Sequence, residues 1–270
     1  MSAFVYHLQY DFFNGLRDRS LLLMNYLFPL ALFLMMGALL GGINPTFHET
    51  MIPAMILIAV MSSTLLAMPN PIVSSREAGV FRSYKINGVP PLSILSAPML
   101  SSLLHMVLVS VIITLTAMPL FKADLPTNWG GFILVGLLGT FAMSGLGMLI
   151  GVISPNSRST ILISQLYFVP SMMLSGMMMP TSLLPAGMQR VALLLPATHA
   201  MNAWNALAFG QPASIDPLWS VLILLAGGLI AFGLAVLLFQ WDSHNQQRGR
   251  SPYLAVLALV PYILAAIFFG

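Results

Sequence analysis

The sequence predicts an all-α protein that crosses a membrane as a bundle of helices, and three observations support this prediction. Hydrophobic residues make up 58% of the 270 residues and charged residues only 6%, whereas a soluble domain carries about 25% charged residues. The apolar residues form runs of about 20 residues, the length that a helix needs to cross a hydrocarbon core. The Lys and Arg residues lie between these runs. We therefore expect one transmembrane domain over residues 1–270.

Six apolar runs are long enough to be membrane spans, and a shorter one follows them. The six runs are residues 21–41, 51–73, 93–120, 129–153, 160–180 and 218–240. The shorter run, residues 252–269, has Pro261 near its middle. We expect it to form a seventh span; the alternative is a helix that lies against the bundle.

The distribution of positive charge predicts the orientation of the spans. With a cytoplasmic N-terminus, eight of the ten Lys and Arg residues fall in cytoplasmic loops, and only Lys122 and Arg190 fall outside. Cytoplasmic loops of membrane proteins carry such an excess. The sequence therefore predicts a multi-pass protein of the cell inner or plasma membrane, with its N-terminus in the cytoplasm.

The sequence lacks the motifs of several classes of activity. It has no cysteine, no nucleotide-binding G-x-x-x-x-G-K-[ST] loop and no H-E-x-x-H or G-x-S-x-G motif. Its net charge of +3 is spread over separate loops, which argues against nucleic acid as a partner. We expect no enzyme activity, no metal and no cofactor in this chain.

One ionisable residue, His105, lies clearly inside a predicted span. The simplest interpretation is a neutral ring that bonds a Ser or a backbone carbonyl within the bundle. A proton- or sodium-driven carrier normally needs several ionisable groups at membrane depth. The energy for any pumping is therefore expected to come from another polypeptide, through a cytoplasmic contact.

Residues 1–20 predict a helix at the cytoplasmic surface of the membrane. They are too polar to cross, yet four apolar side chains recur at every fourth position and form one stripe of a helix. The stripe and the basic residue that follows it are Phe4, Leu8, Phe12, Leu16 and Arg17. Such a helix lies in the membrane interface. The alternative is a simple anchor ahead of the first span.

The stretch from Ser74 to Pro91 is polar and holds four of the 17 charged residues of the chain. Ser74 and Glu77 have the spacing of a capping box, which predicts a helix of about three turns that begins near residue 75 and ends at Asn87-Gly88. The residues that we assign to contact with a cytoplasmic partner are Arg76, Glu77, Phe81, Arg82, Tyr84 and Lys85. The two aromatic residues are expected to face the membrane or the partner, and the last two basic residues water. The alternative is a solvated loop that only sets the topology.

Residues 181–217 form an outer loop that is too apolar to lie free in water. Pro185 suits the first position of a helix, and Pro196 breaks the run that follows it. Thr198 is placed to cap a second helix, which ends at Gly210. We predict two short helices that dip back into the outer leaflet.

Two further features, a glycine pair and a methionine-rich segment, are better explained by helix packing than by a reactive or metal-binding site. Gly147 and Gly151 form a G-x-x-x-G pair in the fourth run, a spacing that lets helix backbones approach closely. We expect this pair to serve packing within the chain rather than a dimer seam. Five of the 20 methionines crowd into the segment SMMLSGMMMP. Without cysteine or clustered histidine, they favour an adaptable apolar lining over a copper site.

Three stretches, taken in order, resemble the membrane subunit of type-two ATP-binding-cassette exporters. RDRSLLLMNYLFPLALFLMMG is similar to the basic and then apolar start of the family's first span. SSREAGVFRSYKINGVPPLSIL resembles the cytoplasmic loop whose coupling helix docks into the ATPase. LSGMMMPTSLLPAGMQRVALLLPATHAMNAW resembles the element that joins spans five and six. The likeness covers residues 1–240; the family usually ends after span six, so the last apolar run is additional.

The resemblance implies partners and a route for a substrate. It implies two copies of a separate ATPase subunit, which bind ATP and Mg²⁺, and a second permease chain, most simply an identical one. It implies a substrate path between the two permeases, lined here by Met55, Ile58, Met61, Ser62, Leu65, Gln165, Phe168, Met172 and Ser175. It also implies that the outer helices gate the exit, with Gly176, Pro180, Pro185 and Pro196 at their bends.

The function expected from this resemblance is export of an amphiphilic compound, drug-like or lipid, when the partner ATPase closes on ATP. A polysaccharide or haem exporter of the same family is an alternative. A non-transporting scaffold or assembly factor is a second, and it predicts that Ser62 and Gln165 tolerate replacement by Leu. A secondary carrier that uses His105 is a third, and it predicts transport that survives depletion of ATP.

Overall fold

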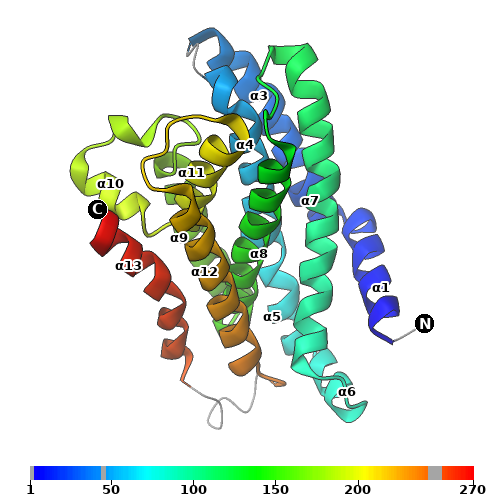
Figure 1. Ribbon diagram of the computed structural model, residues 1–270. Coiled ribbons are helices and arrows are strands. Elements are labelled where there is room, and N and C mark those ends of the chain that lie inside the picture. The colour runs from blue at the N-terminus through cyan, green and yellow to red at the C-terminus, as the bar shows by residue number, and fades with distance from the viewer. Residues whose placement is uncertain (1–2, 44–46, 243–250) are drawn as a thin grey trace.

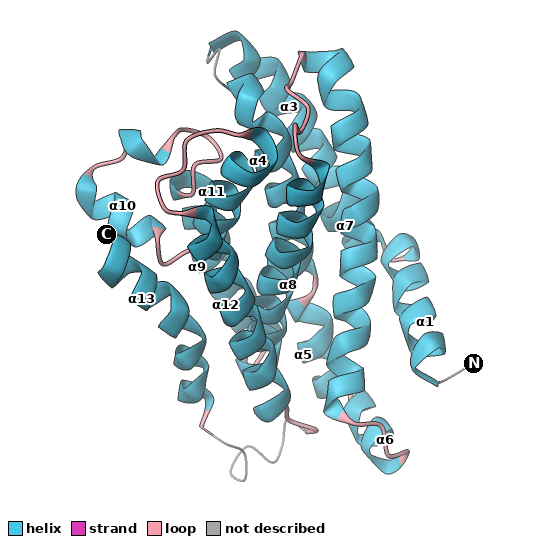
Figure 2. Cartoon of the chain, in the orientation of Figure 1, coloured by secondary structure: helices cyan, strands magenta, loops and turns pink. Residues whose placement is uncertain are grey.

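The computed structural model describes residues 3–43, 47–242 and 251–270, and every regular element in these ranges is a helix (Figure 1, Figure 2). The predicted all-α class is therefore confirmed. Within the described residues, six helices are long and apolar enough to cross a membrane. They are Arg19–Gly41, Phe47–Glu77, Pro91–Phe121, Trp129–Ile153, Pro217–Leu237 and Pro252–Phe269.

The first part of the chain forms the N-terminal helix and two spans. Its elements are α1 (Ala3–Arg17), α2 (Arg19–Leu22), the π-helical η1 (Leu23–Leu27), α3 (Phe28–Ile43), α4 (Phe47–Met61), the π-helical η2 (Ser62–Ala67) and α5 (Pro69–Glu77). Asp18 separates α1 from the first span. Its carboxylate accepts hydrogen bonds from the backbone N–H groups of Ser20 (2.8 Å) and Leu21 (3.0 Å) and so caps α2.

The second part contains the remaining spans and the short helices between them. Its elements are α6 (Val80–Ile86), α7 (Pro91–Phe121), α8 (Trp129–Ile153), α9 (Ser157–Leu174), the 3-10 turn η3 (Thr181–Leu183), α10 (Ala186–Ala192), α11 (Pro196–Phe209), α12 (Pro217–Leu237), the 3-10 helix η5 (Pro252–Leu259) and α13 (Val260–Phe269). Helix α8 has the bounds that the sequence predicts.

Helix α9 differs most from its predicted run, residues 160–180. It begins three residues earlier and ends at Leu174, because Gly176 follows in a left-handed conformation with a φ of 86°. Its 18 residues include Arg158, Gln165 and four serines, and it is not among the six helices apolar enough to cross. Its polar face therefore needs protein neighbours.

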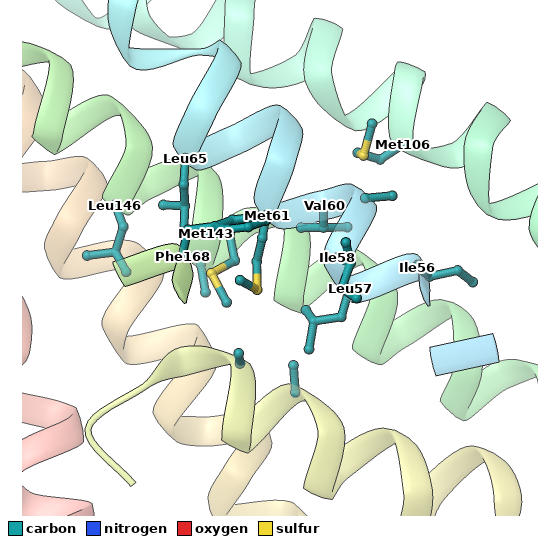
Figure 3. Packing of buried hydrophobic residues seen from close by; sticks show 14 of the residues in the cluster. Ile56, Leu57, Ile58, Val60, Met61, Leu65, Met106, Met143, Leu146 and Phe168 are labelled. Atoms are coloured by element: carbon teal, nitrogen blue, oxygen red, sulfur yellow. The ribbon is translucent and has the colours of Figure 1, made fainter. Parts of the chain in front are cut away.

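Helix α4 lies at the centre of the bundle. Of the apolar part of the span Phe47–Glu77, 94% is buried inside the chain. Figure 3 shows residues of this span packed with others from three neighbouring helices: Ile56, Leu57, Ile58, Val60, Met61, Leu65, Met106, Met143, Leu146 and Phe168. Because lipid tails are as apolar as these side chains, close packing rather than exclusion of water holds the helices together in a membrane.

Glycine allows α8 to approach this central span. A Cβ atom at Gly147 would lie 1.9 Å from the carbonyl oxygen of Thr64, and one at Gly151 would lie 2.9 Å from that of Pro69. No larger residue fits at Gly147 without separating the helices. The prediction that this pair packs α8 within the chain is confirmed.

Helices α10 and α11, called the outer helices after their predicted side, lie at the end of the bundle opposite α6 (Figure 1). Two helices are thus present as expected, and α11 ends at Gly210, whose φ is 67°. Their position in the outer leaflet stays a prediction. The predicted cap by Thr198 is wrong, because its hydroxyl donates to the carbonyl oxygen of Ala192 at 2.6 Å. Pro196 instead begins α11 as its first residue. Most of α11 is buried against α4, α8 and α12.

The last segment, η5 and α13, runs beside α12 and ends near α10 (Figure 1). It is one of the six helices long and apolar enough to cross, in agreement with the predicted seventh span. Only α13 is α-helical, because Pro261 has no N–H to bond the preceding turn. The Tyr262 ring fills the space over Gly227, where an added Cβ would lie 2.1 Å from the hydroxyl oxygen.

Candidate functional site

The charged stretch forms an elbow between α5 and α7, at one end of the bundle (Figure 1). Gly79, with a φ of 75°, turns the chain between α5 and α6. The predicted helix start near residue 75 is wrong, because Ser74 does not cap a helix: its hydroxyl donates to the carbonyl oxygen of Pro71 at 3.2 Å. Helix α6 consequently has seven residues rather than about three turns. Its predicted end at Asn87-Gly88 is confirmed.

Arg76 is buried in this elbow, with 4% of its surface exposed. Its Nη1 donates a hydrogen bond to the carbonyl oxygen of Val152 at 2.8 Å, and its Nη2 donates to that of Ser154. These carbonyls end α8, where backbone oxygens lack donors within the helix. The guanidinium therefore ties the elbow to α8, whereas the neighbouring Glu77 is exposed.

The basic side chains of α6 contact the residues that follow α12. Arg82 Nη2 lies 2.6 Å from Asp242 Oδ2, and Lys85 Nζ lies 6.0 Å from the centroid of the Trp241 ring. The hydrogen bond with Asp242, and then its negative charge, raise the pKa of the Arg82 guanidinium. Even so, 54% of the Arg82 side chain is exposed. Neither partner was predicted from the sequence, although an aromatic and an acidic residue stand directly after the sixth apolar run.

The aromatic side chains of α6 point into the protein, so the expectation that they face the membrane or the partner is wrong for Phe81. Phe81 is buried, with its ring centroid 5.0 Å from that of Phe239 and 6.4 Å from that of Tyr84. Burial raises the pKa of the half-buried Tyr84 phenol, and the negative charge of Asp11 raises it further. Helix α6 thus has an aromatic inner face and a basic outer face. The expected exposure of Arg82 and Lys85 is confirmed.

Helix α1 packs against α7 (Figure 1). Of the predicted stripe, Phe4, Leu8 and Phe12 are half-buried, and Leu16 and Arg17 are exposed. A second set of apolar side chains points outward: Val5, Tyr6, Tyr10 and Phe13. The helix therefore has one face on the bundle and another that is free to meet lipid, which agrees with the predicted interfacial position without testing it.

His105 lies where α1 meets α7. Its ring stacks on that of Phe12, with centroids 4.6 Å apart and 7° between the planes. Its Nδ1 lies 2.6 Å from the hydroxyl oxygen of Tyr26, which is a hydrogen-bond distance. The ring is thus bonded within the bundle as expected, but the nearest partner is a tyrosine of the first span rather than a serine.

The residues assigned to the substrate path fall into two groups. The five on the second span are buried inside the chain: Met55, Ile58, Met61, Ser62 and Leu65. In the group on α9 and its end, Phe168 and Ser175 are buried, Met172 is half-buried and Gln165 is exposed. The Ser62 hydroxyl donates to the carbonyl oxygen of Met24 at 2.9 Å and so joins the first two spans. A path along the second span therefore requires the bundle to open, and the role of these residues stays a prediction.

A cavity of about 510 Å³ lies at the end of the bundle opposite α6, among the start of α4, the segment that follows α9, α11 and the segment that follows α11. Two of the predicted gate residues, Gly176 and Pro180, line it, whereas Pro185 and Pro196 stand at the starts of α10 and α11. The structure thus brings the four residues to one end of the molecule. Whether they gate an exit stays a prediction.

Comparisons with known proteins found a family model and a curated protein that match most of the chain. The family model described as ABC-2 type transporter matches residues 2–209, which include α1, the elbow and both outer helices. The curated protein "Putative transport permease YvfS" of Bacillus subtilis (strain 168) is 24% identical over 224 residues, which cover 81% of this chain and 89% of that protein. No solved structure matches significantly.

Proposed function

Because the chain belongs to the ABC-2 type transporter family, a family of permeases that act with an ABC ATPase, we propose that it forms the membrane path of an ATP-driven exporter. The proposed cargo is an amphiphilic compound, drug-like or lipid, which leaves the cytoplasm. ATP and Mg²⁺ bind to the separate ATPase subunit, two copies of which act on a pair of permease chains. The absence of a phosphate-binding loop from this sequence agrees with that division of labour.

The attachment of α6 to three spans supports this proposal best. The elbow makes α6 an extension of the second span, and Arg76 ties the elbow to the end of α8. Phe81 and Arg82 contact Phe239 and Asp242, which follow α12. A displacement of α6 by a partner would therefore move these three spans together.

The tip of α6 also has the surface expected of a docking element. Ile86 is 85% exposed, the highest value among the large apolar side chains of the described residues. It stands beside Lys85 and close to Arg82, which are also exposed. An exposed apolar side chain within a charged surface is typical of a site that contacts another protein.

A second copy of the chain is the proposed partner within the membrane. The outward side of α9 is apolar along its length, with exposed side chains at Ile161, Leu162, Leu166, Val169 and Met173. The polar Gln165 is exposed among them. We place the substrate path between this surface and its counterpart in the second copy.

The proposal predicts that replacing both Arg82 and Lys85 with Glu uncouples transport from ATP hydrolysis. Export of the fluorescent amphiphile Hoechst 33342 from proteoliposomes should fall by about tenfold or more, because like charges at an interface oppose docking. The thermal midpoint of the permease should change little, because both side chains are exposed. The measurements are dye export and ATP hydrolysis by the ATPase that co-purifies with the chain.

A charge exchange serves as the matched control. Arg82→Asp combined with Asp242→Arg keeps a salt bridge at this position but reverses its direction. Restored export would show that Arg82 acts through Asp242, and lost export would show that Arg82 meets the ATPase directly. Export by the double Glu variant at the wild-type rate would contradict the proposed coupling. Accumulation of dye by the purified chain alone, without any ATPase, would overturn the proposed function.

A further inference from the structure

A separate cavity of about 320 Å³ lies beneath α1, bounded by α5, α6 and α7. None of the residues assigned to the substrate path or to the outer gate lines it, and of the residues assigned to contact with a cytoplasmic partner only Phe81 and Tyr84 do. A role for this cavity is therefore separate from the proposed export function and does not rest on it.

One acidic side chain lines this cavity. Among the residues that line it, Asp11 of α1 is the one Asp, Glu, Lys or Arg. Its Oδ2 atom is buried and has no hydrogen-bond partner; His7 Nε2 lies 3.6 Å away, beyond hydrogen-bond distance but within ion-pair distance when the ring of His7 is protonated. Burial raises the pKa of the Asp11 carboxyl, and the charge of His7 opposes this shift only in part. The carboxylate therefore has an ion-pair partner in protonated His7 but lacks a hydrogen-bond donor at Oδ2.

A second acceptor without a donor lines the same cavity. Asn25, in η1, is 5% exposed, and its Oδ1 atom has no hydrogen-bond partner. Buried side-chain oxygens are seldom left in this state, so each one needs an explanation. Two unpaired acceptors call for a ligand that donates hydrogen bonds. An anionic ligand does not fit, because no Lys or Arg is among the described residues that line the cavity.

Aromatic rings and apolar side chains form the rest of the wall. Tyr84 lies in the middle of an aromatic group, with its ring centroid 5.7 Å from that of His7 and 6.4 Å from that of Phe81. The faces of such rings attract organic cations. Ile72 and Leu95 add apolar surface. No group of three or more metal-binding side chains occurs among the described residues, which disfavours an inorganic cation.

We propose that this cavity binds an organic ammonium group carried on an apolar body. Asp11 and the Asn25 amide oxygen accept hydrogen bonds from the ammonium group, the ring of Tyr84 faces its charge, and the apolar wall contacts the attached hydrocarbon. Two sources carry this chemistry: a lipid with an ethanolamine headgroup and a free cationic amphiphile.

The test measures binding of decylamine, which is protonated at pH 7, to the purified full-length chain in detergent by native mass spectrometry and titration. Wild type should bind it saturably, and Asp11→Asn should weaken binding by about tenfold or more, because a charge-assisted hydrogen bond is lost. Glu77→Gln, which removes an exposed carboxylate outside the cavity, should change the affinity by less than about twofold. Equal affinities of wild type and Asp11→Asn would overturn the proposal.

Two controls separate a binding defect from a folding defect. Neutral 1-decanol should bind wild type and Asp11→Asn with the same affinity. If wild type bound decanol as tightly as decylamine, the site would not recognise charge. If Asp11→Asn elutes as an aggregate, Tyr84 provides a second pair: Tyr84→Phe keeps the ring and should retain binding, whereas Tyr84→Leu should lose it several-fold. Equal binding by these two variants would count against the site.

A competition experiment in nanodiscs distinguishes a lipid headgroup from a free cationic amphiphile as the source of the ammonium group. Phosphatidylethanolamine added to phosphatidylglycerol discs should displace decylamine if the lipid headgroup is the natural occupant. Retained decylamine binding supports a free amphiphile instead, and either result supports an ammonium site. If replacing Asp11 changed the binding of neither phosphatidylethanolamine nor decylamine, both sources would be rejected. No ATPase or ATP enters these measurements, so their failure leaves the proposed export function untouched.

Discussion

Replacing Gly147 with Ala is expected to destabilise the protein by about 3 kcal/mol, at the upper end of the effects of overpacking. The added methyl group would lie 1.9 Å from the carbonyl oxygen of Thr64. That oxygen belongs to the backbone of η2, so it cannot rotate away as a side chain would. The α8 helix and the central span would have to move apart at their contact, which also contains Gly151.

The same substitution at Gly233 is the matched control. Gly233 lies in α12, and a Cβ atom there would meet nothing within 4 Å. Ala should therefore be neutral or stabilise the helix by about 0.5–1 kcal/mol, since Gly has the poorer helix propensity. Thermal unfolding of the two variants in the same detergent measures the difference. If the thermal unfolding midpoints of the two variants were the same, the contact between α8 and the central span would tolerate an added methyl group more easily than the structure implies.

Local composition was sufficient to predict most of the long helices of this protein. The predicted bounds of α8 agree with the structure, because its apolar run is long and ends at polar residues. The outer helices were predictable from Pro185, Pro196 and Gly210, since proline fixes φ at a helix start and glycine readily adopts the left-handed conformation that ends a helix. Helix α9 was predicted less well, because its apolar run continues past Gly176, where the chain turns.

Contacts between distant residues could not be predicted in this way. Arg76 and Arg82 stand six residues apart in one charged stretch, and nothing local distinguishes them. The turn at Gly79 places Arg76 against the end of α8 and leaves Arg82 beside Asp242. The unpaired acceptors of Asp11 and Asn25 depend in the same way on how α1 packs. The functional interpretation of each residue therefore needed the folded chain.

Replacing Arg76 with Met is expected to destabilise the protein by roughly 3 kcal/mol, because it removes two hydrogen bonds from a charged donor and leaves their acceptors unpaired. The guanidinium donates to the carbonyl oxygens of Val152 and Ser154, at the end of α8. That end carries the negative pole of the helix dipole, which a buried positive charge stabilises. Arg76→Lys should recover only part of the loss, since a single ammonium group does not reproduce the two-pronged geometry.

Hydrogen exchange gives this prediction a readout beyond the thermal midpoint. Without the Arg76 side chain, the last turn of α8 should open more often, and the amides around Ile150–Ser154 should exchange faster than in wild type. Arg82→Met provides the comparison, because Arg82 contacts Asp242 and does not touch α8. If Arg76→Met left both the midpoint and this exchange unchanged, the elbow would not be held to α8 by its guanidinium. A displacement of α6 would then reach the second span and, through Phe239 and Asp242, α12, but not α8. The joint movement of three spans would lose one of its links.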